Sequence, residues 1–165
     1  MCSIFGVTDR SIHPNTLEEC FERTVSRGPD MSRFEEVGPG YLGFHRLAIM
    51  GLNERGMQPF HMGGDSVVCN GELYGFRPLR ARLMEKYEIK GESDCEILLP
   101  LYHEYGAEMF KTLDAEFALI LYDGSEGRFI AARDPIGIRP LYYGRLESGG
   151  GGGCGGTQKT MCVCV

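Results

Sequence analysis

The sequence predicts an α+β fold with largely antiparallel sheets. Short apolar runs typical of strands lie in both halves of the chain, with one helical pattern near the start and two more in the middle. The connections include short turns of the hairpin type, and no internal repeat is present. Strands and helices that come in separate blocks favour this class over a doubly wound fold, in which they alternate. With 165 residues, of which 42% are hydrophobic, the chain fits one domain with a real core.

The first half of the chain predicts a strand, a helix and two more strands. Residues 2–7 form an apolar run that suits a buried strand. Asn15 or Thr16 can cap a helix that must end before Gly28-Pro29, because proline disfavours a helical conformation in the residue before it. Two further strands are expected at 40–50 and 66–70, with a loop at 51–65 between them.

The second half predicts two helices followed by three strands. The helix at 78–87 has Pro78 in its first turn, and the helix at 94–105 has Gly106 as its stop. The strands are expected as a hairpin of 116–122 with 128–133, and a last strand at 140–144.

The end of the chain differs in composition from the rest. Residues 149–165 hold seven of the 24 glycines and three of the seven cysteines, and they show no hydrophobic period. We therefore expect one domain over 1–148 and a Gly/Cys-rich tail over 149–165 that is disordered or foreign to the protein. A metal-binding role for Cys154, Cys162 and Cys164 is disfavoured, because their spacing lacks the paired ligands of a zinc site.

Charge and hydropathy disfavour two classes of partner. The chain has 17 Lys+Arg against 23 Asp+Glu, a net charge of −6, so nothing in its charge favours nucleic acid or an anionic membrane surface. No stretch approaches the ~18 apolar residues of a membrane span, and the first residues lack the features of a secretory signal. The cysteines of 1–148 show no C-x-x-C spacing. We expect a cytoplasmic protein with reduced thiols.

Cys2 is a candidate nucleophile because of its position. Removal of Met1 before a small second residue would leave a cysteine that carries both a thiol and a free α-amine. α-Amino groups ionise near neutral pH, so the amine can serve as the base for its own side chain. Taken by itself, however, the residue is better explained as a small hydrophobic side chain at the start of a buried strand.

Asn70 and Gly71 are candidates for an oxyanion hole. They follow an apolar strand directly, where an Asn amide and a Gly backbone N–H can supply two preorganised donors to an oxyanion. The alternative is a plain Asn-Gly hairpin turn, which the pair by itself favours.

Two charged residues are candidates for binding the ends of an amino acid. Arg46 lies in an otherwise apolar strand, where its guanidinium would suit an α-carboxylate or, more commonly, an internal salt bridge. Asp94 can bind an ammonium group or cap the helix that begins there, and capping is favoured. His45 and His61 have no ligand or dyad spacing, so the sequence predicts no metal site.

The segment 132–144 is too rich in Pro and Gly for a regular element, yet too apolar for a solvent loop. We expect a buried turn in which Arg133 and Asp134 satisfy backbone groups.

Eight motifs together resemble one family. They are MCSIFG, RGPD, HRL, GMQP, NGELYG, ESDCE, EFALILYD and ARDPIGIRPLYYG, and they cover about residues 1–145. In this order and spacing they resemble the class II glutamine amidotransferase domain of the N-terminal nucleophile hydrolases. The opening Cys-Ser-Ile-Phe-Gly resembles the glutaminase half of glutamine-hydrolysing asparagine synthetase more than the hexosamine and purine amidotransferases, which typically open Cys-Gly-Ile.

The resemblance implies a fold and a set of roles. The fold would be a four-layer α/β/β/α sandwich of antiparallel sheets. Cys2 would be the nucleophile, with its α-amine as base, and Asn70 and Gly71 would form the oxyanion hole. The substrate-binding residues implied for glutamine are Arg46 for the α-carboxylate, Asp94 with Glu72 for the α-amino group, and the flanking strand residues Leu47 and Ile49.

The chain also departs from the family pattern. It has no phosphate-binding Ser-Gly-Gly-x-Asp-Ser loop and no room for a synthetase domain, so ATP and Mg²⁺ are implied only for that missing C-terminal partner. The glutaminase step itself implies no cofactor. Further strands of the family are not recognisable after PLYYG, which predicts an incomplete sandwich with an exposed sheet edge. Two alternatives stay open: the glutaminase of another class II amidotransferase, or a non-catalytic remnant that keeps the fold.

Overall fold

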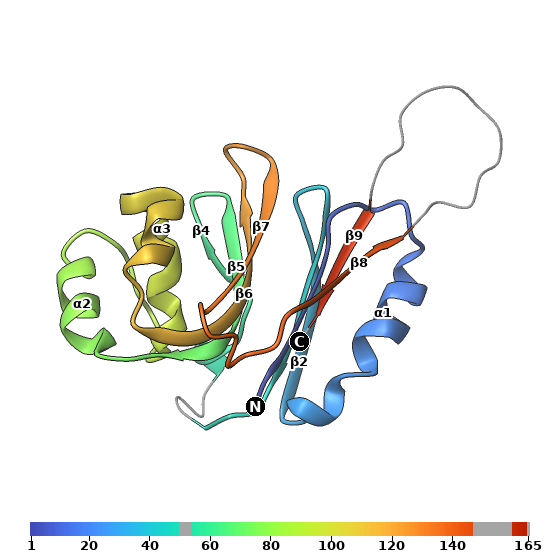
Figure 1. Cartoon of the computed structure of the whole chain (residues 1–165), viewed down its shortest axis with the longest axis horizontal. Helices are drawn as coiled ribbons and strands as arrows, with labels where there is room; N and C mark the ends of the chain where they lie inside the picture. The colour runs from blue at the N-terminus through green and yellow to red at the C-terminus, as the bar shows by residue number, and fades with distance from the viewer. Residues whose placement is uncertain (50–53, 147–159, 165) are drawn as a thin grey trace.

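The computed structural model describes residues 1–49, 54–146 and 160–164, and these form four layers (Figure 1). Helices α2 and α3 cover the outer face of one sheet, a second sheet packs against its inner face, and α1 covers the far side of the second sheet. The predicted α+β class and the four-layer arrangement are therefore confirmed. The helices are α1 (Pro14–Glu22), α2 (Phe76–Leu83) and α3 (Leu98–Tyr105), with 3-10 turns η1 (Val25–Arg27), η2 (Glu54–Gly56), η3 (Asp94–Ile97) and η4 (Gly106–Lys111).

Both sheets are antiparallel throughout their described strands. One has the order β2-β3-β1-β9-β8 and the other β4-β5-β6-β7. The strands of the first are β1 (Ser3–Val7), β2 (Met31–Val37), β3 (Gly40–Arg46), β8 (Tyr142–Leu146) and β9 (Thr160–Cys164). Those of the second are β4 (Phe60–Met62), β5 (Asp65–Leu73), β6 (Ala115–Asp123) and β7 (Arg128–Arg133).

Most differences from the sequence prediction lie at the ends of elements. Helix α1 begins at Pro14 and is capped by the His13 side chain, which accepts from the Asn15 N–H at 3.3 Å; neither Asn15 nor Thr16 is the cap. Strand β3 ends at Arg46, opposite Met31 at the start of its partner β2, and the described residues 47–49 do not continue it; residue 50 lies outside the described part.

Two strands before the C-terminal tail were missed. The charged segment Met31–Val37 forms β2, because it pairs along its whole length with β3 and its polar side chains face solvent or partly buried positions. Phe60–Met62 forms β4 inside the expected loop, where it pairs with the start of β5. Each is a strand because it pairs with the next strand along the chain, and its own hydrophobic pattern does not reveal it.

The tail also differs from the sequence prediction. Residues 160–164 form β9, although no regular structure was expected over 149–165; the residues 147–159 and 165 lie outside the described part. Strand β9 pairs with β1 on one side and with β8 on the other. The edge of β1 is therefore covered by β9, which lies between β1 and β8.

The inward faces of the two sheets form the central core. Because side chains alternate along a strand, Ile4 of β1, Phe44 of β3 and Val68 of β5 point into this layer, together with Ala118 and Ile120 of β6. The opposite face of β5 and β6 packs on α2 and α3, and the opposite face of β1 packs Phe5 and Val7 on α1. This alternation decides which side chains can meet between the sheets.

A buried histidine joins α1 to the first sheet. The ring of His45 lies flat on Phe21 at 3.7 Å between centroids, and its nitrogens bond the Ser32 hydroxyl at 2.7 Å and the Phe21 carbonyl at 3.0 Å. Its role is thus structural. Within the described ranges, the helices are too short and too polar to cross a bilayer.

Candidate active site

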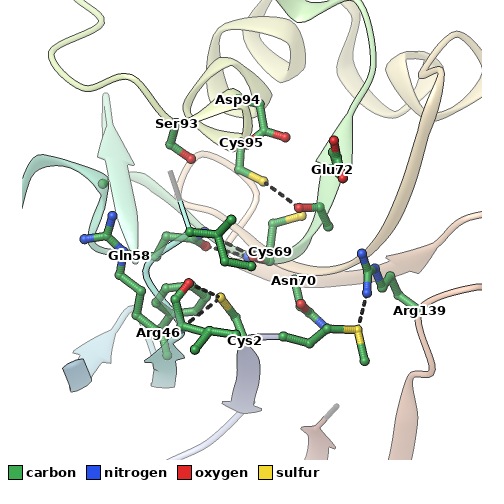
Figure 2. A pocket seen from close by; sticks show the side chains of 16 residues that line it. Cys2, Arg46, Gln58, Cys69, Asn70, Glu72, Ser93, Asp94, Cys95 and Arg139 are labelled. Atoms are coloured by element: carbon green, nitrogen blue, oxygen red, sulfur yellow. Dashed lines mark hydrogen bonds between the residues drawn. The ribbon is translucent and has the colours of Figure 1, made fainter. Parts of the chain in front are cut away.

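A cavity of about 190 Å³ lies where the central core ends. Three of its side chains stand two residues beyond a core position on the same strand face: Cys2 beyond Ile4, Arg46 beyond Phe44, and Asn70 beyond Val68. Polar side chains from both sheets therefore converge at the end of the apolar layer between the sheets. Figure 2 shows Cys2 and Asn70 in the middle of this cavity, Arg46 on one side and Arg139 on the other.

All eight residues predicted for the site line this one cavity. They are Cys2, Arg46, Leu47, Ile49, Asn70, Gly71, Glu72 and Asp94. The structure brings them together from the residue before β1, from β3, β5 and η3, and from the segment after β3. Their individual chemical roles remain predictions.

The Cys2 thiol lies against the backbone of Leu47. The Leu47 N–H donates to the sulfur at 3.4 Å, and the thiol donates to the Leu47 carbonyl at 3.7 Å. The side chain is half-buried, so one side is held by the protein while the other faces the cavity. A donor aimed at the sulfur suits a nucleophile that carries negative charge.

The segment Arg27–Asp30 holds Leu47 in place. The Asp30 carboxylate accepts from the Ala48 N–H at 2.8 Å, the Asp30 N–H donates to the Arg46 carbonyl at 3.0 Å, and Arg27 donates to the Cys2 carbonyl at 3.4 Å. A Cβ on Gly28 would lie 2.2 Å from the His45 carbonyl oxygen, so only glycine permits this approach. Leu47 and Ile49 thus lie in an irregular segment next to the cavity, and the prediction of a strand there is wrong.

Asn70 and Gly71 lie within β5, so the hairpin-turn interpretation is wrong. Asn70 pairs with Ala118 and Gly71 with Phe117 of β6. A Cβ on Gly71 would come within 2.6 Å of the Glu116 carbonyl oxygen, which explains the glycine by close packing. The Asn70 side chain is 4% exposed, and its amide nitrogen is buried without a hydrogen-bond partner. Such a group is costly unless a ligand completes it.

Arg46 and Asp94 are buried charges that line the cavity from different elements. Arg46 is on β3, and Asp94 opens η3 above β5 (Figure 2). The Asp94 carboxylate accepts from the Leu73 N–H at 2.7 Å and makes no capping bond to its own helix, so the cap interpretation is wrong. A guanidinium and a carboxylate on the rim of one small cavity suit a zwitterion.

Cys95 and Cys69 contribute thiols to the same wall. Hydrogen bonding with Cys69, followed by burial, raises the pKa of Cys95 well above its usual value. The Cys95 thiol also lies 3.9 Å from the Gly71 carbonyl oxygen, to which it donates. Cys95 is therefore a neutral packing group, in contrast to the half-exposed Cys2.

The turn predicted in 132–144 is exposed rather than buried, with Ile136 84% and Ile138 52% exposed, and only the expected role of Asp134, which is itself buried, is confirmed. Its carboxylate accepts from the N–H groups of Phe117, Gly137, Ile138 and Arg139 at 2.6–3.3 Å. Burial by itself would raise the pKa of Asp134, but these backbone hydrogen bonds outweigh it and lower the pKa. Arg133 makes no such backbone bond among the described contacts, so the role expected of it is wrong; its guanidinium group lies next to Gly137.

Sequence reasoning missed two polar residues of the cavity, Gln58 and Arg139. The guanidinium of Arg139 pairs with Glu116 and touches the sulfur of Met1 at the mouth of the cavity (Figure 2). Gln58 is buried and bonds the backbone of Cys69. The GMQP and GIRP motifs contain both residues, but nothing in their spacing indicates that they reach β5 and β6.

Comparison with known proteins adds to this geometry. The family model described as "Glutamine amidotransferase domain" matches residues 1–161. The chain belongs to this family. The match extends past the last residue covered by the quoted motifs and reaches into β9.

Several curated relatives are similar over most of the chain. A probable glutamine-hydrolysing asparagine synthetase of Acanthamoeba polyphaga mimivirus is 43% identical over 133 residues, covering 76% of this chain and 24% of its own length. Asparagine synthetase B of Escherichia coli is 37% identical over 155 residues, covering 90% of this chain and 28% of its own length. Amidase chry2 of Gibberella zeae is 41% identical over 134 residues, covering 77% of this chain and 20% of its own length.

The predicted resemblance to the glutaminase half of asparagine synthetase is therefore confirmed: the chain belongs to the amidotransferase family and is similar to proteins named glutamine-hydrolysing asparagine synthetase. The chain spans only about a fifth to a quarter of the length of these relatives. The amidotransferase domain is the part that they share with it.

Proposed function

We propose that this domain hydrolyses glutamine to glutamate and ammonia through a thioester on Cys2. The observation that carries the proposal is the buried, unpartnered Asn70 amide in the same cavity as a half-exposed cysteine that precedes β1. A nucleophile and an unsatisfied donor that face one space are what acyl transfer requires.

The chemistry begins with removal of Met1. The freed α-amine takes the thiol proton, and the thiolate attacks the side-chain amide carbon of glutamine. The Asn70 amide and the Gly71 N–H stabilise the oxyanion of the tetrahedral intermediate. Collapse breaks the C–N bond, and the α-ammonium passes its proton to the departing ammonia. Water then attacks the thioester and releases glutamate, which restores the Cys2 thiol.

Glutamine would be recognised through its two charged ends. Arg46 would bind the α-carboxylate, whereas Asp94 with Glu72 would bind the α-amino group. Leu47 and Ile49 would flank the bound substrate from the segment after β3. With both ends held, the side-chain amide would be directed toward Cys2, which lines the same cavity and which a productive complex must bring close to the amide carbon.

In a longer protein, we propose that the ammonia is used by a C-terminal synthetase domain for ATP-dependent amidation of aspartate to asparagine. The support is the similarity to relatives named glutamine-hydrolysing asparagine synthetase. ATP and Mg²⁺ would belong to that domain, while the glutaminase step needs neither. A second candidate is the glutaminase domain of another class II amidotransferase, because a relative with a different name, Amidase chry2, is 41% identical over a similar span.

The direct test is glutamate release from glutamine by the purified chain, with Cys2→Ala as the matched inactive control. We expect turnover in the first and none in the second. A folded chain without Met1 that releases no glutamate would contradict the proposal.

The state of the N-terminus provides an independent test. Intact-mass measurement should show loss of Met1 in the active protein. A variant with a non-cleavable N-terminal extension, in which the α-amine of Cys2 stays blocked, should be inactive. Full activity with a blocked α-amine would rule out the amine as base.

A further inference from the structure

Gln58 occupies an unusual place beside β5. Strand β4 pairs with β5 from Met62 opposite Asp65 to Phe60 opposite Val67, and no β4 residue pairs beyond that. Two positions further along, the same register would set residue 58 opposite Cys69. The side chain of Gln58 fills this position: its Nε2 donates to the Cys69 carbonyl at 3.0 Å, and its Oε1 accepts from the Cys69 N–H at 2.6 Å.

The amide of Gln58 thus acts as one residue of a β-ladder. Both of its hydrogen bonds are buried, and Gln58 is only 4% exposed. Without it, an N–H and a C=O of Cys69 would be buried and unsatisfied on the edge of β5 that faces away from β6. The opposite edge is already held by the pairing of Asn70 with Ala118.

The position of these two hydrogen bonds between Gln58 and Cys69 is significant, because Cys69 directly precedes Asn70. The peptide between them sets the direction in which the Asn70 side chain leaves the strand. That side chain makes no hydrogen bond of its own through its amide nitrogen, so nothing else on the donor side fixes it. A strand held on both edges keeps the donor aimed into the cavity, where Gln58 itself also forms part of the wall (Figure 2).

We infer that Gln58 is a positioning residue for the oxyanion hole, which acts through the backbone of Cys69 on Asn70 and Gly71. The inference rests on the proposed function, since it assigns a second support to the same site. Gln58 touches β5 rather than the reacting atoms, so its effect should appear in the transition state and not in substrate binding.

The test compares Gln58→Glu and Gln58→Leu with the wild type. Gln58→Glu is isosteric and keeps the acceptor for the Cys69 N–H but loses the donor to its carbonyl; Gln58→Leu loses both. We expect kcat to fall about ten-fold to a hundred-fold, less than complete loss of an oxyanion donor, with KM for glutamine within about two-fold.

Two inhibitors separate the effects further. The γ-aldehyde analogue of glutamine forms a tetrahedral adduct with the thiol and places an oxyanion in the oxyanion hole. Glutamate reports only the binding of the α-carboxylate and the α-amino group. In both variants, the affinity for the aldehyde should fall by about the same factor as kcat. Their affinity for glutamate should equal that of the wild type. The activity of Gln58→Glu relative to wild type should also rise at low pH, when the protonated carboxyl can donate to Cys69.

Ser66→Ala is the matched control. It removes a side-chain bond of β5 to His61, at 2.9 Å, on the same strand but away from the cavity, and should change neither kcat nor aldehyde binding. Unchanged kcat and aldehyde binding in folded Gln58 variants, or equal losses for aldehyde and glutamate, would overturn the inference. An inactive wild-type chain would instead remove the proposed function and this inference with it.

Discussion

Asn70 and Asp123 are equally buried, yet their surroundings are opposite. They lie on neighbouring strands at opposite ends of the same sheet, and each is 4% exposed. The Asn70 amide nitrogen has no partner. The Asp123 carboxylate accepts from the Tyr102 hydroxyl at 2.6 Å, the Ser125 hydroxyl at 2.7 Å, and the N–H groups of Ser125 and Glu126 at 3.0 Å.

The comparison shows that burial alone does not identify a functional polar residue in this fold. The carboxylate at the β6–β7 turn is saturated with donors, so it holds the turn and the helix layer together and has no capacity left for a ligand. The amide at the cavity keeps an unused donor. Its cost to stability makes sense only if a bound oxygen completes it.

The largest effect should come from Asn70→Ala. Removal of an oxyanion donor should lower kcat for glutamine about 10²–10³-fold. Because the donor has no partner in the free protein, urea unfolding should show no loss of stability. A large loss of stability with normal kcat would reverse the comparison.

Asp123→Ala should have the opposite pattern. It leaves the Tyr102 hydroxyl and two turn N–H groups without their acceptor, which should cost about 2–4 kcal/mol of unfolding free energy. The kcat of the folded fraction should be that of the wild type. Denaturant titration together with activity at low temperature measures both quantities, and a defect confined to kcat would contradict the assignment.

Acid should remove the contribution of Asp123 selectively. Hydrogen bonds from Tyr102 and then Ser125 lower the pKa of Asp123 from 3.8 to about 2. Since the folded pKa is the lower one, this stabilisation is present above pH ~3.8 and is lost as the pH falls through about 2; it amounts to about 2 kcal/mol. The stability difference between wild type and Asp123→Asn should therefore shrink by that amount between pH 4 and 2, and a constant difference would disprove the linkage.

The smallest effect is expected at an exposed ion pair. Lys111 bonds Glu108 at 2.7 Å, but both side chains are more than 70% exposed. Lys111→Ala should change the unfolding free energy by less than about 0.5 kcal/mol and leave kcat unchanged. A larger change would show that an exposed ion pair can stabilise this fold as much as a buried polar group whose hydrogen bonds are all made.

Much of the fold followed from local patterns. The apolar run at β1, the Gly106 stop after α3 and the β6–β7 hairpin are confirmed because each depends on periodicity or turn chemistry within a few residues. Strands β2 and β4 were missed because one is polar and the other short, so that only their pairing with the next strand along the chain defines them. Strand β9 was missed because it follows a Gly-rich segment and one of its partners, β1, lies at the other end of the chain.

The sequence by itself indicated which residues form the site, through a cysteine before the first strand and a set of motifs whose order points to one family. All eight site residues predicted in this way line one cavity. Only the tertiary structure decided how they meet. It placed Asn70-Gly71 inside a strand, freed Asp94 from capping and brought Gln58 to Cys69. The physical reason is that side-chain alternation along a strand is local, whereas the partner of each buried polar group is set by chain segments far away in sequence.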